Sequence, residues 1–173
     1  MAVNAADVAV GDTVVYSIHG LGRVVGRKRR RVQGAMTETV ILQFDEGGLT
    51  VSLPLERARE QLRRVVNEVE LGEVQDRLRG LGTVSDESWL TRQRHTLAKL
   101  NRGLPPELAE IVRDAAAREQ KLTAKGTKTV LSPGEREVSL RARQLLAEEI
   151  GHVRGVSSTE AADWIDQQLP HAG

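Results

Sequence analysis

The sequence predicts an α+β protein in which a small antiparallel β-domain precedes an all-helical domain. Two observations lead to this prediction. Residues 11–54 contain short runs of β-branched residues separated by turn formers, a pattern typical of strands. After Pro54 the apolar residues recur at the three- and four-residue spacing of amphipathic helices. Because the strands all precede the helices, we expect two domains, at residues 1–58 and 65–173.

The β-domain is expected to hold four or five short strands. Gln33-Gly34-Ala35 can turn the second strand into the third, and DEGG at residues 45–48 can turn the third into the fourth. This many short antiparallel strands in about 55 residues is typical of a small twisted barrel of the SH3 or Tudor type, whose core is marginal alone. The predicted strands are GDTVVYSI, GRVVGRKR, ETVILQF and LTVSLP.

The helical domain is expected to hold about five helices. Apolar residues over 71–81 indicate the first, and a second begins after a cap at Ser85 or Asp86 and ends at Gly103. Pro105 is a good first residue for the third.

An exposed loop and two further helices complete this domain. The polar stretch LTAKGTKTV, residues 122–130, is expected to be the loop, and its lysines could add phosphate contacts. Ser132 with Glu135 forms a capping box that predicts the fourth helix. The last helix begins at Ser157 and ends before Pro170.

The composition excludes several classes of protein. The chain has 173 residues, a formal net charge of +1 and no cysteine, which excludes disulfides and thiolate chemistry. No apolar run approaches the roughly 20 residues that span a bilayer, and no signal peptide is recognisable, so we expect a cytoplasmic protein without membrane contact. The G-x-G at residues 20–22 lies between strands and favours a hairpin over a phosphate cradle. The four histidines are scattered, so we expect no metal, no cofactor and no enzyme.

Two windows of the chain hold basic residues without acidic ones. Residues 19–37 contain the first, and residues 88–103 the second, which also includes Trp89, one of only four aromatic side chains. Local patches on a nearly neutral chain favour selective contacts over indiscriminate polyanion binding. The basic residues are Arg23, Arg27, Lys28, Arg29, Arg30 and Arg31 in the first window, and Arg92, Arg94, His95, Lys99 and Arg102 in the second.

Each window has two interpretations. If Val24 faces the core, simple alternation turns Arg27, Arg29 and Arg31 away from it and Arg30 toward it, although both faces of a hairpin tip can be exposed. The alternative is a solvated edge strand protected by charge. Trp89 is either the lid of the helical core or a half-packed indole that stacks on or wedges against a base, worth on the order of 1–3 kcal/mol.

Four motifs in register resemble one family. The segments VGDTVVYSIHGLGRV, GGLTVSLP, SWLTRQRHTLAKL and LSPGERE resemble the CarD-like (CarD/CdnL) bacterial transcription factors, over roughly residues 8–153. The N-terminal part is also similar to the polymerase-interacting module of transcription-repair coupling factor. The resemblance implies a Tudor-like domain that docks on the RNA polymerase β subunit. It also implies a helical domain that stabilises the promoter open complex.

The resemblance also implies roles for single residues. Trp89 would wedge into the minor groove at the upstream edge of the bubble, with slight sequence preference, while Arg92, Arg94 and Arg136 hold the DNA backbone. Lys99, on the flank of Trp89, is expected to contact DNA with them.

Arg30 and Val32 match positions that the family uses against polymerase. Ser52 stands where that surface usually has a basic residue, and Thr91 replaces a basic residue of the DNA patch. Nothing in the sequence indicates an obligate dimer, so a monomer is expected. The alternative function is a protein-only adaptor that bridges polymerase to another protein without touching DNA.

Overall fold

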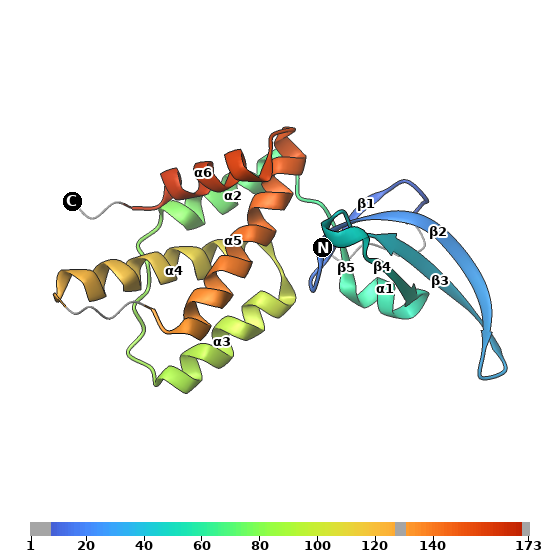
Figure 1. Ribbon diagram of the computed structural model, residues 1–173, viewed down its shortest axis with the longest axis horizontal. Helices are drawn as coiled ribbons and strands as arrows, with labels where there is room; N and C mark the ends of the chain where they lie inside the picture. Colours follow the sequence, from blue (N-terminus) through green and yellow to red (C-terminus); the bar gives the residue numbers. More distant parts are fainter. Residues whose placement is uncertain (1–7, 127–130, 171–173) are drawn as a thin grey trace. The chain divides into compact units, whose positions relative to one another are not determined.

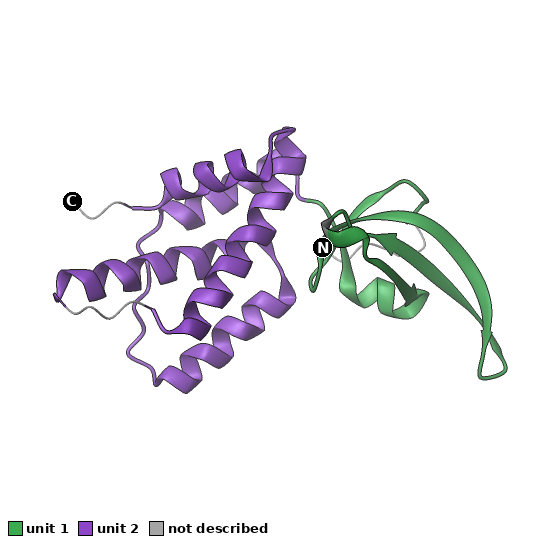
Figure 2. Ribbon diagram, viewed as in Figure 1, with its two compact units in different colours: residues 1–65 green, residues 66–173 purple. Residues whose placement is uncertain are grey.

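The computed structural model of the chain describes residues 8–126 and 131–170, which divide into two compact units, residues 1–65 and 66–173 (Figure 2). Strands precede helices, as predicted (Figure 1). Within the described ranges the α-helices number six rather than about five, because the unpredicted α1 belongs to unit 1. The strands are β1 (Thr13–Tyr16), β2 (Gly20–Val32), β3 (Ala35–Gln43), β4 (Thr50–Pro54) and β5 (Leu62–Arg64). The helices are α1 (Leu55–Gln61), α2 (Glu68–Arg79), α3 (Trp89–Arg102), α4 (Pro105–Ala124), α5 (Pro133–Arg154) and α6 (Ser158–Gln168).

Unit 1 is built on one antiparallel sheet with the strand order β4-β3-β2-β1-β5. The expected closed barrel is not confirmed, since the edge strands β4 and β5 do not pair with each other. α1 connects these two edges and buries Ala58 completely. Unit 1 also extends past the predicted end at residue 58, because β5 pairs with β1.

A β-bulge in β2 decides which side chains face the core of unit 1. The register shifts between Val24 and Gly26, which leaves Val25 as the extra residue. A bulge exchanges the two faces of the strand beyond it. Arg27 therefore pairs with the buried Val40 and lies on the core side. Simple alternation predicted the reverse: beyond the bulge the core-side set is Arg27, Arg29 and Arg31, and the opposite set is Lys28, Arg30 and Val32.

The β2–β3 hairpin turns where the sequence predicted it. Gln33 and Gly34 both have positive φ, 52° and 86°, as a two-residue turn with right-handed strand twist requires. The G-x-G also lies in a hairpin: a Cβ on Gly22 would approach the Phe44 ring to 2.6 Å, so only glycine fits there. This close packing, rather than phosphate binding, explains the motif.

Unit 2 packs its helices around a core drawn from α2, α4, α5 and α6. α3 contributes no buried residue, and its Leu100 packs only at the margin. Glu149 is buried in this unit and accepts a hydrogen bond from the backbone N–H of Val66 at 3.0 Å, so it fixes the start of the unit. None of the helices in the described ranges is long and apolar enough to cross a membrane.

The predicted caps of unit 2 are partly confirmed. The capping boxes of Ser132 and Ser157 are both present. α3 is capped by Ser88, not by Ser85 or Asp86. The expected loop at 122–130 is wrong in its first part, because helical hydrogen bonding continues to Ala124; residues 127–130 lie outside the described residues.

Candidate functional site

Trp89 is the first residue of α3 and lies half exposed on unit 2. The Ser88 hydroxyl accepts a hydrogen bond from the Thr91 N–H at 3.3 Å and lies 2.9 Å from the Thr91 hydroxyl, which fixes the start of the helix. The Trp89 side chain is 49% exposed and is not among the residues packed on the core. Trp164, in contrast, packs on the core, with the Arg154 guanidinium 4.2 Å from its ring centroid. Trp89 is therefore not the lid of the helical core.

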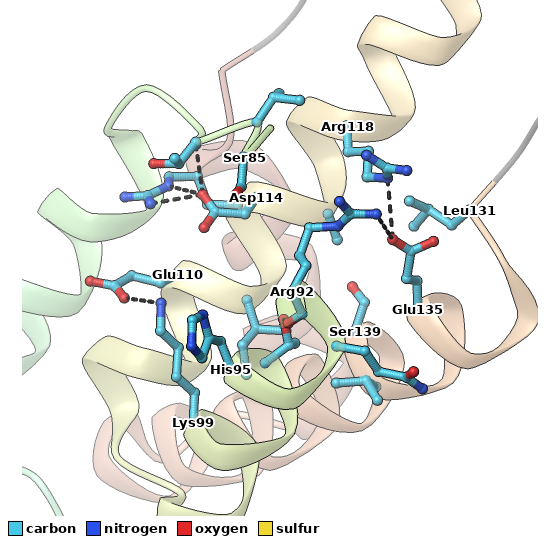
Figure 3. Close-up of a pocket in the computed structure, with 18 of the residues that line it drawn as sticks. Ser85, Arg92, His95, Lys99, Glu110, Asp114, Arg118, Leu131, Glu135 and Ser139 are labelled. Atoms are coloured by element: carbon cyan, nitrogen blue, oxygen red, sulfur yellow. Dashed lines mark hydrogen bonds and ion pairs between the residues drawn. The ribbon is translucent and has the colours of Figure 1, made fainter. Parts of the chain in front are cut away.

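Arg92 points into a pocket of about 720 Å³ between α3, α4, α5 and residues 83–87 (Figure 3). Its Nη1 donates to the Glu87 carbonyl at 2.9 Å, and its Nη2 lies 3.5 Å from Glu135 Oε1. Arg118 on α4 pairs with the same carboxylate oxygen at 3.2 Å. Only 20% of the Arg92 side chain is exposed, so this guanidinium serves contacts within unit 2.

Lys99 and Arg102 are also neutralised by acidic residues of α4. Lys99 Nζ lies 2.8 Å from Glu110, and Arg102 forms a two-pronged ion pair with Glu107. Burial raises the pKa of Glu110, but the hydrogen bond from Lys99 and the nearby cationic charges outweigh it, so this pKa lies below its ordinary value. Residues 88–103 contain no acidic residue in sequence, but the fold brings acidic residues of α4 next to them.

Arg94 and Arg136 are the predicted DNA contacts that remain available. Both are exposed, and neither side chain forms a hydrogen bond or ion pair with the described part of the chain. Their helices approach each other, because a Cβ on Gly134, in the first turn of α5, would lie 3.6 Å from Gln93 Nε2 in the second turn of α3.

The three predicted polymerase contacts share one face of the sheet. Ser52 of β4 pairs with Ile41 of β3, which pairs in turn with Gly26 of β2, so these three residues lie on one face. Every second residue of β2 after Gly26 lies on this face too, which includes Arg30 and Val32. All three predicted residues are exposed. The bulge is what places this surface on the opposite side from the core.

The acidic partners of the basic side chains of α3 are the functional residues that sequence reasoning missed. Glu107 and Glu110 lie on another helix, and no spacing within residues 88–103 indicates them. The capping box identified Glu135 as a cap, without indicating its contacts with Arg92 and Arg118. In the described ranges no three His, Asp or Glu side chains are placed to hold a metal ion.

Together these features define a modular binding protein. One unit has a basic β-ribbon, and the other has a half-exposed indole and two exposed arginine side chains without a described partner. Two family models match the chain: the CarD-like/TRCF RID domain over residues 8–66 and the CarD C-terminal domain over residues 73–166. The chain belongs to the CarD-like family, as its motifs predicted. This membership places it among RNA polymerase-interacting transcription regulators.

Proposed function

We propose that unit 1 binds the β subunit of RNA polymerase and that unit 2 stabilises the promoter open complex by contacting the minor groove at the upstream edge of the bubble. The single observation that carries the DNA contact is the half-exposed Trp89 at the start of α3, in the same unit as the exposed Arg94 and Arg136 side chains. Apolar side chains that insert between base steps act on minor grooves in this way.

The mechanism is differential binding, without catalysis. A protein that binds the open complex more tightly than the closed one shifts the equilibrium by the difference in affinity. If Trp89 contributes about 1.4 kcal/mol to the open state alone, the ratio of open to closed complexes changes about tenfold. Minor-groove contacts distinguish little beyond A·T from G·C, so sequence preference is slight.

The phosphate contacts are assigned to Arg94 and Arg136. Arg92 and Lys99 form ion pairs with Glu135 and Glu110. These two residues therefore hold α3 in place and do not contact phosphate directly. A surface with so few free cations binds DNA weakly and in a salt-sensitive manner. Attachment to polymerase compensates by raising its effective concentration at the promoter.

Unit 1 provides this attachment through Arg30, Val32 and Ser52. Val32 gives the surface an exposed apolar contact, and Arg30 gives it a charge. Because Ser52 cannot supply a second charge, we expect this interface to depend more strongly on Arg30.

A protein-only adaptor is the second candidate function. Leu90 and Leu97, also on α3, are 51% and 38% exposed, and with Trp89 they form an apolar surface that a second protein could cover. This candidate predicts that position 89 contacts protein and not DNA.

A photo-crosslinker at position 89 tests the proposal in a reconstituted complex of polymerase, promoter and full-length protein. We expect crosslinks to the promoter strands at the upstream edge of the bubble. A crosslinker at Ser139, which lies in the α3–α5 pocket, is the control and should label DNA poorly. Crosslinks from position 89 to protein alone would favour the adaptor.

A further inference from the structure

The tip of the β2–β3 ribbon has a second basic surface that the proposed function does not use. β4 pairs with β3 only as far as Thr39, and β1 pairs with β2 only as far as Arg23. Beyond these points the ribbon has two strands (Figure 1). The side chains of residues 28–36, at its tip, are exposed on both faces. Each face can therefore meet a different partner.

The bulge sorts four consecutive basic residues between these two faces. Lys28 and Arg30 share a face with Val32 and Ser52, the surface assigned to polymerase. Arg29 and Arg31 lie on the other face, opposite Glu38 and Met36 on β3. We call Arg29, Arg31 and Met36 the second ribbon face.

The positive charge of the second ribbon face is not compensated within the described chain. Glu38 is the only acidic residue between positions 13 and 44, and its carboxylate lies 2.8 Å from Arg27 Nε. Arg27 is held in addition by the carbonyl oxygen of Val8 at 3.0 Å. The side chains of Arg29 and Arg31 form no hydrogen bond or ion pair with any described residue.

We propose that the second ribbon face binds the phosphate backbone of duplex DNA, as a contact separate from the α3 surface. Arginine matches phosphate in charge and can donate two parallel hydrogen bonds to it. A two-stranded ribbon also fits a major groove about 12 Å wide. A protein partner would need apolar or aromatic anchors, and this face offers only Met36. The inference rests on the proposed function for one point, that promoter duplex lies near the polymerase-bound protein.

The test measures binding of the full-length protein to a short random-sequence duplex, without polymerase, over a range of salt concentrations. The double variant Arg29→Gln/Arg31→Gln is compared with Lys28→Gln/Arg30→Gln, which removes the same charge from the opposite face of the same ribbon. We expect the first variant to reduce the slope of log K against log salt by about 1.8, since each released phosphate contact contributes about 0.9. We expect the second variant to leave most of the slope intact and to weaken binding to the polymerase β-subunit lobe.

Two results would overturn the inference. Equal loss of slope in both variants would mean general charge attraction without a preferred face. An unchanged slope in Arg29→Gln/Arg31→Gln, with loss of polymerase binding, would make the second ribbon face a protein contact. Because the DNA-binding assay contains no polymerase and no melted DNA, the salt slopes are independent of whether Trp89 stabilises the open complex.

Discussion

Among single residues, the arginines of α3 differ in what their charge is available to do. Arg92 and Arg94 are two positions apart, yet Arg92 is enclosed by Glu87 and Glu135 while Arg94 is exposed without a described partner. A side chain that is already paired with a carboxylate neutralises phosphate poorly, so it releases few of the counterions bound to DNA. Equal charge in the sequence therefore does not mean equal contribution to DNA affinity.

This difference gives a prediction for DNA binding. Arg94→Ala and Arg136→Ala should each reduce the salt slope of DNA affinity by about 0.9, the contribution of one phosphate contact. Arg92→Ala is the matched control and should leave the slope nearly unchanged. Salt titrations of duplex binding check this, and an equal effect of all three substitutions would show that Arg92 is also available to phosphate.

Among the elements, α3 is unusual because ion pairs hold it where core packing is limited to Leu100 at the margin. It buries no residue, and its pocket side is tied to Glu135, Glu110 and Glu107. Burial raises the pKa of Glu135, but hydrogen bonds from Ser132 and the charges of Arg118 and Arg92 outweigh it and hold this pKa below its ordinary value. A carboxyl with a lowered pKa stabilises the fold above its unfolded pKa, about 4.3, and this stability is lost as the pH falls through the folded value.

We therefore expect Glu135→Gln to loosen α3 at neutral pH. Hydrogen exchange of the α3 backbone amides should become faster in this variant, and acidification through the lowered pKa of Glu135 should have a similar effect on the unmodified protein. Glu137→Gln is the control, since Glu137 is exposed and pairs with no described residue. Unchanged exchange in Glu135→Gln would mean that the ion pairs do not position the helix.

The bulge in β2 gives a prediction about polymerase binding. Arg30→Glu should weaken binding to the β-subunit lobe at least tenfold, because reversal of a charge in an interface is costly. Arg29→Glu makes the same charge change one residue away, on the opposite face, and should bind almost normally. Affinity for the isolated lobe is the measurement, and similar losses in both variants would place the contact at the hairpin tip as a whole.

At the scale of the whole molecule, much of the fold follows from local pattern. The turn at Gln33–Gly34 and the capping boxes of Ser132 and Ser157 were predictable because each depends on residues adjacent in sequence. The bulge at Val25 was not, since it is defined only by pairing with β3. The neutralisation of Lys99 by Glu110 was missed for the same reason, because the partners belong to different helices.

The central claim is that the Trp89 indole stabilises the open complex after the protein has bound polymerase. Because the side chain is half exposed, Trp89→Ala should change the free energy of unfolding little. The direct measurement is the lifetime of open complexes on a responsive promoter, with Trp89→Ala compared with the unmodified protein at saturating concentration. We predict a lifetime about tenfold shorter, as 1.4 kcal/mol implies, and a partial recovery in Trp89→Phe. An unchanged lifetime with polymerase binding intact would contradict the account.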